Sequence, residues 1–318
     1  MKLGLAMAGG GARGSALIGA LMELDALGIK PDLIAGTSIG GIIGSMYAAG
    51  MTPEQLAEIM RGINPSQLYG LPRDDSSITS NEKVAALIQK SFTDHFGEDY
   101  FADRPNPRPR FNDLQIPMAV IATDLISRQE VVMDEGDLVR ALLATSCVPV
   151  LFPPVKYADR YLVDGFLVNN IPLDVVRSRG ALFTVAIDLT SSSPYSMEKE
   201  EETASRAFNI DWSEFIDGRI FDRFLYQSTR GQLWRVVTSV MDVISTGNSR
   251  LTVHINPPDL LIEPYLGTIG LLDFHRVDEG IEAGRKAVRR AAPDVEKLLT
   301  RMEKLREAEL AELEPETD

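Results

Sequence analysis

The chain has 318 residues, of which 44% are hydrophobic and 25% charged, so it can bury a large core without disulfide bonds or structural metals. Its net charge of −14 argues against nucleic-acid binding and against electrostatic docking on anionic lipid. The single cysteine, Cys147, excludes an internal disulfide and fits a reducing compartment. No run approaches the roughly 18 apolar residues of a membrane-spanning helix. We therefore expect a cytoplasmic protein whose partners are not nucleic acids.

The first fifty residues predict a strand, a helix and a second strand. An apolar strand over residues 3–8 runs straight into the glycine loop Gly9-Gly10-Gly11-Ala12-Arg13-Gly14, without the cleavage site of a signal peptide. Apolar side chains then recur at helical spacing over residues 16–27, and Gly28 is placed to end that helix. A second strand begins at residue 33. Parallel strands joined by a right-handed crossover are expected, with both following loops at the carboxyl edge of one sheet.

The second loop has the pattern G-x-S-x-G, written here as Gly36-Thr37-Ser38-Ile39-Gly40. A serine on a tight strand-to-helix turn forms a nucleophile elbow, in which the flanking glycines avoid clashes where the chain passes close to its neighbours. The turn holds the hydroxyl over a helix N-terminus, whose dipole favours developing negative charge. The alternative is a glycine-rich turn without chemistry, because short motifs also occur by chance.

The glycine loop also matches G-x-G-x-x-G, the signature of a dinucleotide-binding domain, through Gly9, Gly11 and Gly14. That domain needs an acidic residue at the end of its second strand to hold a ribose. Here the strand ends at Ser38, and the nearest acid, Asp32, precedes it. A Rossmann domain is therefore the weaker interpretation.

The rest of the chain continues the alternation of helices and strands that defines an α/β protein. Thr52 and Pro53 form a clear helix start. Helices are expected over residues 51–63, 82–92, 137–144, 173–179 and 274–289, and strands over 118–124, 129–133, 160–163, 181–189 and 259–262. Residues 64–80 and 101–111 carry the prolines, glycines and serines of irregular connections.

Residues 211–253 are helical in pattern and rich in Phe, Leu, Trp and Met. We favour helices that cover the far face of the sheet, with an apolar lid or a wall for an acyl chain as the alternative. The last residues, 294–314, predict a charged helix with little apolar face.

A serine hydroxyl needs a base beside it at neutral pH. The chain has three histidines, His95, His254 and His275. None of them directly follows a predicted strand in a motif that would mark the base. Asp164, by contrast, directly follows an apolar strand and precedes a glycine. A carboxylate can act as the base if nearly dry surroundings raise its pKa toward neutrality. Asp124 also ends a strand and is the second candidate. The glycine loop offers N–H donors for the oxyanion at a helix N-terminus.

The three motifs stand in the order found in the patatin-like phospholipase family, which this chain resembles. They are the glycine loop that ends in Arg13-Gly14, the G-x-S-x-G elbow, and Asp164-Gly165. Further stretches resemble family positions: Ala122-Thr123-Asp124-Leu125, Ser146 to Pro153, Asn170-Ile171-Pro172 and Leu271-Leu272-Asp273-Phe274. The resemblance covers most of residues 1–190 and a shorter block around 258–290.

The resemblance implies a three-layer α/β/α fold with a mostly parallel central sheet, and a serine–aspartate dyad that works without histidine. By that match Ser38 is the nucleophile and Asp164 the base, followed by Gly165. The oxyanion hole would be formed by the glycine loop: Gly9, Gly10, Gly11, Arg13 and Gly14. The elbow glycines are Gly36 and Gly40. No metal or cofactor is implied. The reaction would hydrolyse a phospholipid, lysophospholipid or other fatty-acyl ester, which suggests peripheral membrane contact as a hypothesis.

Two residues depart from the family pattern. Leu17 stands where bacterial relatives often carry histidine, and Phe166 follows the Asp-Gly where they usually have a small residue. Phe166 could shape an acyl pocket or crowd it. For Arg13, two roles stay open: orienting the glycine loop or meeting a phosphate, and a salt bridge at the helix start.

The expected organisation is one acyl hydrolase domain over residues 1–292, with a helical cap or insertion at about 195–255, and a charged tail over 293–318. Two rival functions remain: a non-catalytic binding module on the same fold, and an acyltransferase that uses the same acyl-serine. Oligomeric state is not readable from the sequence.

Overall fold

The computed structural model describes residues 2–64, 68, 77, 79–104, 106–190 and 229–313, with backbone alone at 229–235 and 310–313. Most of the connection predicted over residues 64–80 lies outside this described part. So do residues 195–228 of the expected cap, including Trp212, Phe215, Phe221 and Phe224.

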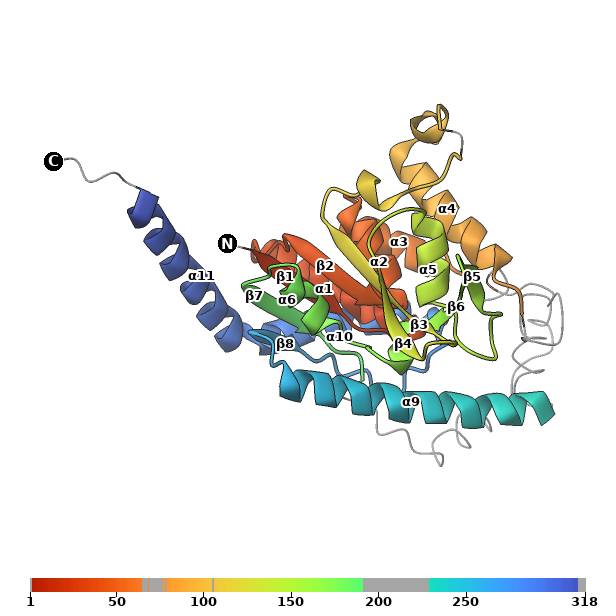
Figure 1. Cartoon of the computed structure of the whole chain (residues 1–318). Coiled ribbons are helices and arrows are strands. Elements are labelled where there is room, and N and C mark those ends of the chain that lie inside the picture. Colours follow the sequence, from red (N-terminus) through yellow and green to blue (C-terminus); the bar gives the residue numbers. More distant parts are fainter. Residues whose placement is uncertain are drawn as a thin grey trace.

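The core of the fold is an eight-stranded, mostly parallel sheet flanked by helices (Figure 1). Five strands run parallel, in the order β3-β2-β1-β7-β8: Met118–Asp124, Leu33–Thr37, Leu3–Met7, Phe183–Ile187 and Leu260–Ile262. The other three are antiparallel to their partners: β4 (Gln129–Met133) and β6 (Arg160–Asp164) on β3, and β5 (Val155–Tyr157) on β6. The predicted α/β class is confirmed.

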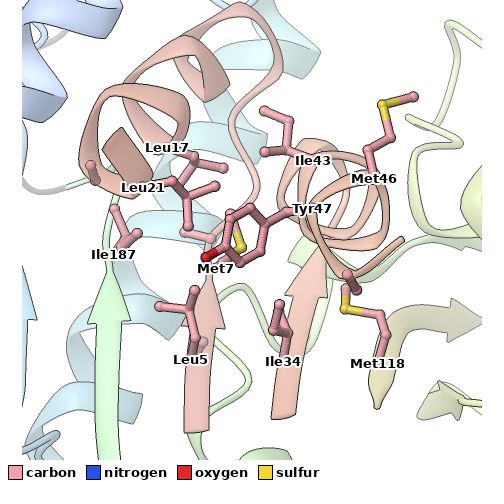
Figure 2. Close-up of a cluster of buried hydrophobic side chains, with 14 of the residues drawn as sticks. Leu5, Met7, Leu17, Leu21, Ile34, Ile43, Met46, Tyr47, Met118 and Ile187 are labelled. Carbon is pink, nitrogen blue, oxygen red and sulfur yellow. The ribbon is translucent and has the colours of Figure 1, made fainter. Parts of the chain in front are cut away.

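The alternation of side chains along the buried strands divides the core between the two faces of the sheet. On one face Leu5, Met7 and Ile34 meet leucines of α1 (Ser15–Ala26) and the side chains of Ile43, Met46 and Tyr47 on α2 (Ile39–Ala48), as Figure 2 shows. On the other face Leu33, Ala35, Ala119 and Ile121 pack against the valines of α6 (Leu173–Ser178). Helices thus cover both faces, which confirms the three-layer prediction.

The remaining helices follow the sequence pattern closely. They are α3 (Pro53–Arg61), α4 (Glu82–Phe96), α5 (Leu138–Thr145), α9 (Thr229–Ile255), α10 (Val277–Arg290) and α11 (Ala292–Leu313). Helix α3 begins with the predicted capping box, in which Thr52 and Gln55 bond each other's backbone N–H groups. Helix α4 is one turn longer than predicted, and Phe96 in that last turn stacks on Tyr100 with ring centroids 4.7 Å apart. Strand β5 was not predicted.

The register around β3 decides where the loops meet. Strand β4 occupies one edge of β3 along Val120–Asp124. Strand β2 pairs with Met118–Ile121 and must therefore lie on the other edge of β3. Strand β6 pairs with Ala122–Asp124, so it lies on the same edge of β3 as β2, further along the strand. Strands β2 and β6 run in opposite directions, so their carboxyl ends meet, with Thr37 opposite Ile121 and Asp164 opposite Ala122.

Helix α9 runs across the molecule beside the carboxyl ends of these strands (Figure 1). Figure 1 also shows α11 extending away from the body. Val295 and Leu298 attach its first turns to the core. In the described part of the chain, no helix combines the length and apolar character needed to cross a membrane.

Candidate active site

The G-x-S-x-G motif forms the turn that joins β2 to α2. Ser38 has φ 54° and ψ −123°, a left-handed conformation that costs a non-glycine residue about 1–3 kcal/mol. Glycine is required on both sides by close approach: a Cβ on Gly36 would lie 2.5 Å from the Gly40 carbonyl, and one on Gly40 would lie 2.4 Å from the Met7 oxygen. The Ser38 N–H donates to Thr145 Oγ1 over 2.9 Å. The strained serine is therefore held by backbone packing and by one buried threonine.

Asp164 ends β6 beside Ser38 and is fully buried. Its N–H donates to the Cys147 carbonyl over 2.9 Å, and its carbonyl accepts from Thr123 Oγ1 over 2.9 Å. Oδ1 accepts from the Phe166 N–H over 3.1 Å, whereas Oδ2 is buried without a hydrogen-bond partner. Burial raises the pKa of Asp164 to about 7, against the opposing effects of the nearby Ser38 hydroxyl and the backbone N–H groups that follow.

The Ser38 hydroxyl lies close enough to Asp164 to lower the pKa of its carboxyl, although no hydrogen bond of standard geometry joins the two side chains. Catalytic hydrogen bonds are often long in the absence of substrate and tighten when it binds. The unpartnered Oδ2 leaves one oxygen free to accept the serine proton. Ser38 and Asp164 line the same cavity.

The glycine loop lies at the end of β1, next to Ser38. A Cβ on Gly9 would lie 3.0 Å from the Ser38 Cβ. Gly11 has φ 56°, and a Cβ there would lie 2.3 Å from the Leu271 carbonyl oxygen, so only glycine fits. Three N–H groups of the loop are already bonded: Gly9 to Asn170 Oδ1, Ala12 to the Leu271 oxygen and Arg13 to the Gly10 oxygen. The N–H groups of Gly10 and Gly11 have no acceptor within the described residues, and both glycines line the cavity.

Arg13 is buried and makes long-range polar contacts. Its Nε donates to the Ile269 oxygen over 2.9 Å, and its two terminal nitrogens lie 3.3 Å from the two carboxylate oxygens of Asp242 on α9. The guanidinium thus joins the glycine loop to α9 and to the segment before α10. Of the two roles that the sequence left open, the structure shows a salt bridge, but with a distant helix rather than its own.

Asn170 connects the same two regions. Its Oδ1 accepts from the Gly9 N–H over 3.1 Å, and its Nδ2 donates to Ser249 Oγ on α9 over 3.1 Å. Asn170 and Ser249 are both fully buried. The adjacent residue on α9, Asn248, donates to the Leu167 carbonyl over 2.9 Å, in the turn that follows Asp164. Helix α9 is therefore bonded both to the glycine loop and to the turn behind the aspartate.

The cavity reaches from Ser38 into the space between α2, α3 and α4. The polar side chains of the lining include Arg13, Asp164, Thr190 and Ser245, and Ser91 adds a hydroxyl on α4. Most of the remaining lining is aliphatic or aromatic, with four side chains from α2 that span about 10 Å of helix: Ile39, Ile42, Ile43 and Met46. Phe166 belongs to this apolar lining. A chain-like apolar ligand with one polar end matches this distribution.

The other sequence candidates lie elsewhere. Asp124 accepts hydrogen bonds from the Ser127 hydroxyl and from N–H groups of the β3–β4 turn, which lower its pKa, and it does not line the cavity. The three histidines are also absent from the lining. Cys147 donates to the Pro153 oxygen, and burial raises the pKa of its thiol, so it is an inert structural thiol. In the described ranges, no three His, Cys, Asp or Glu side chains cluster as metal ligands would.

Sequence reasoning missed three residues that hold the site together: Thr145, Asp242 and Ser249. Each acts through one hydrogen bond or ion pair to a residue more than 70 positions away. No local pattern marks a single serine, threonine or aspartate for such a contact. The helical pattern of residues 211–253 was the only available signal for the last two. Helix α9 lines the cavity through Met241, Asp242 and Ser245 rather than only covering a far face of the sheet, and the alternative of an apolar lid or a wall for an acyl chain stays a prediction.

Comparison with known proteins agrees with the motifs. The family described as patatin-like phospholipase matches residues 5–177, just over half of the chain. An uncharacterized NTE family protein of Mycobacterium tuberculosis is 29% identical over 304 residues, which cover 92% of this chain and 47% of the relative. Patatin-like phospholipase domain-containing protein 7 of Mus musculus is 27% identical over 291 residues, 89% of this chain and 20% of the relative.

The chain therefore belongs to the patatin-like phospholipase family. It spans about half the length of the mycobacterial relative and about a fifth of the mouse one. Among solved structures, VipD of Legionella pneumophila aligns with a TM-score of 0.57 at 13% identity, over 91% of this chain and 66% of VipD. That likeness shows the shared fold.

Proposed function

We propose that this protein is a serine acyl-ester hydrolase in which Ser38 is the nucleophile and Asp164 the base. The observation that carries the proposal is the free Oδ2 of a buried aspartate, whose pKa is about 7, beside a strained serine at the polar end of an apolar cavity. A base with a pKa near the working pH is the most effective. Family membership supports the reaction class, and the residue roles are our proposal.

The reaction proceeds in two steps. As Ser38 Oγ attacks the ester carbonyl carbon, its proton passes to Asp164 Oδ2. The N–H groups of Gly10 and Gly11 hold the resulting oxyanion, and each such donor lowers a barrier by roughly 2.7–4 kcal/mol in measured precedent. The C–O bond then breaks, the alcohol leaves with the proton from Asp164, and an acyl-Ser38 ester remains. Water attacks this ester by the same route and releases the fatty acid.

The substrate class follows from the cavity. The acyl chain would lie along α2 between α3 and α4, where the lining is apolar, with its ester at Ser38. Phospholipids, lysophospholipids and simpler fatty-acyl esters all meet this description. Substrates of this kind reside in lipid surfaces, so we also infer peripheral contact with a membrane.

The test is covalent labelling by a fluorophosphonate followed by intact mass measurement. We expect one label on the wild type, none on Ser38→Ala, and much slower labelling of Asp164→Asn. Asp124→Asn is the matched control, because its carboxylate accepts only turn hydrogen bonds and should label at the wild-type rate. A folded wild type that stays unlabelled, with and without detergent, would refute the proposal. Products formed with glycerol present then separate hydrolysis from acyl transfer.

A further inference from the structure

Helix α9 has two faces of different character. Its inner face is buried, with Met241, Ser245 and Ser249 at intervals of four residues. These side chains line the cavity or bond Asn170, and Asp242 beside them pairs with Arg13. The inner face therefore belongs to the active site.

The outer face carries what we call the aliphatic strip: Val236, Val240, Val243, Ile244, Leu251 and Ile255. At 100° per residue these positions fall within an arc of about 120° on the side opposite the buried serines. Their side chains are between 37% and 72% exposed. A row of six exposed aliphatic side chains along one helix is unusual, and such patches mark surfaces that contact lipid or protein.

The charge around the strip is as distinctive as its apolar character. Between residues 236 and 255 the only carboxylate is Asp242, which is turned inward to Arg13, and the basic residues are Arg250 and the exposed His254. The whole chain carries a net charge of −14. The outer face of α9 thus has no carboxylate of its own to repel an anionic lipid surface.

We propose that the aliphatic strip of α9 docks this protein on a lipid bilayer. The proposal rests on the proposed function, because a lipid ester must pass from a bilayer into the cavity that the other face of the same helix lines. The six side chains of the strip are aliphatic and uncharged, so they can enter the acyl region of a bilayer without desolvating a polar group, which favours lipid. Docking through aliphatic side chains also agrees with a chain too acidic for electrostatic attachment.

The experiment compares sedimentation of the full chain with phosphatidylcholine vesicles at low and high salt. We expect the wild type to bind at both salt concentrations, since apolar docking is not screened. The double variant Val243→Asp/Leu251→Asp should bind at least about tenfold more weakly, because it places two charges in the strip. Leu182→Asp is the matched control: it is similarly exposed but lies before β7, at the amino edge of the sheet, and should bind as the wild type does.

Circular dichroism and Ser38 labelling of each variant report whether fold and site are intact, and Val243→Ser/Leu251→Ser provides a milder change if the charged variant unfolds. Equal vesicle binding by the wild type and a folded strip variant would overturn the proposal. So would a wild-type dimer that the strip variant dissociates while vesicle binding persists, because the strip would then bind a second copy. If vesicles bind through the strip but Ser38 is never labelled, the docking proposal stands and the proposed function fails.

Discussion

The two walls of the cavity are held in place by different kinds of force. The wall that carries Ser38 and Asp164 is fixed by the backbone, because two strand ends meet there on one edge of β3. A Cβ added to either of the glycines that flank Ser38 would lie within 2.5 Å of a neighbouring backbone atom. The α9 wall is joined to the site by side chains, through Arg13–Asp242, Asn170–Ser249 and Asn248–Leu167.

This difference indicates how each wall tolerates change. Backbone register and close glycine contacts cannot adjust locally, so a substitution there must shift strands. A helix attached by a few side chains can lose one contact and keep the others, at a cost of roughly 1–3 kcal/mol each. We therefore expect all-or-none effects on the strand-end wall and graded effects on α9. Five predictions follow from this difference and from the buried Asp164, in order of decreasing effect.

Gly40→Ala should have the largest effect. Its Cβ would lie 2.4 Å from the Met7 oxygen and 2.6 Å from the Ala8 oxygen, so β1 and α2 must move apart. We expect a loss of about 3 kcal/mol or more in the free energy of unfolding, measured by urea denaturation, together with loss of Ser38 labelling. The control is Gly247→Ala on α9, where a Cβ meets nothing within 4 Å. The unfolding free energy of Gly247→Ala should increase by roughly 0.5–1 kcal/mol. Similar losses in both variants would contradict the comparison.

The pH dependence of ester hydrolysis should report Asp164. Protonated Asp164 cannot accept the Ser38 proton, so kcat/KM should fall tenfold per pH unit below the pKa of about 7. At pH 5 the rate would be about 100-fold below its plateau. Asp124→Asn should keep the same profile. An acidic limb with a midpoint near pH 4 would mean that the buried aspartate is not the base.

The same carboxyl also predicts a change in stability with pH. Its pKa in the folded state is raised, so between pH 4 and 7 the folded state holds a proton that the unfolded state releases. The stability from this group is therefore present at low pH and lost as the pH rises through 7. Asp164→Asn removes the ionisable carboxyl and with it the loss of stability at high pH. The unfolding free energy of this variant relative to wild type should therefore increase from pH 5 to pH 8 in urea titrations. A constant difference would show that Asp164 does not titrate in this range.

Asp242→Asn should have an intermediate effect on α9. The Arg13 guanidinium would keep its bond to the Ile269 oxygen but lose its ionic partner while buried. We expect a loss of about 2 kcal/mol in unfolding free energy and partial loss of activity. The matched control is Asp278→Asn, whose ion pair with Arg61 is exposed and should contribute well under about 1 kcal/mol. Equal losses of unfolding free energy in the two variants would show that the buried Arg13–Asp242 pair contributes no more than an exposed ion pair.

Ser249→Ala should have the smallest effect. It leaves Asn170 Nδ2 without its partner, while Oδ1 still accepts from Gly9. We expect about 1 kcal/mol of destabilisation and a several-fold decrease in kcat with little change in KM, because the glycine loop is held less firmly. Ser249→Thr should restore kcat, and Thr246→Ala on the same helix should leave it unchanged. A rise in KM with unchanged kcat would place Ser249 in substrate binding instead.

Local sequence determined the parts of the site that depend on local backbone chemistry. The glycines around Ser38 predicted a strained turn, because only residues without a side chain allow that close approach. Thr52 and Gln55 predicted the start of α3, and the apolar runs predicted the buried strands, since capping and hydrophobic periodicity act over a few residues. The sequence singled out Asp164, the proposed base, by its place between a strand and a glycine together with the family resemblance.

Tertiary structure alone decided which of these pieces meet. The antiparallel placement of β6 on the same edge of β3 as β2 depends on pairing between residues 38 to 42 positions apart for β6 and 84 positions apart for β2, for which the sequence carries no local signal. The same holds for Thr145 under Ser38, Asp242 on Arg13 and Ser249 on Asn170. Each is a single polar side chain whose partner is set by the closure of the whole chain. The motifs thus predicted the type of reaction, and long-range packing determined how the residues proposed for it are arranged.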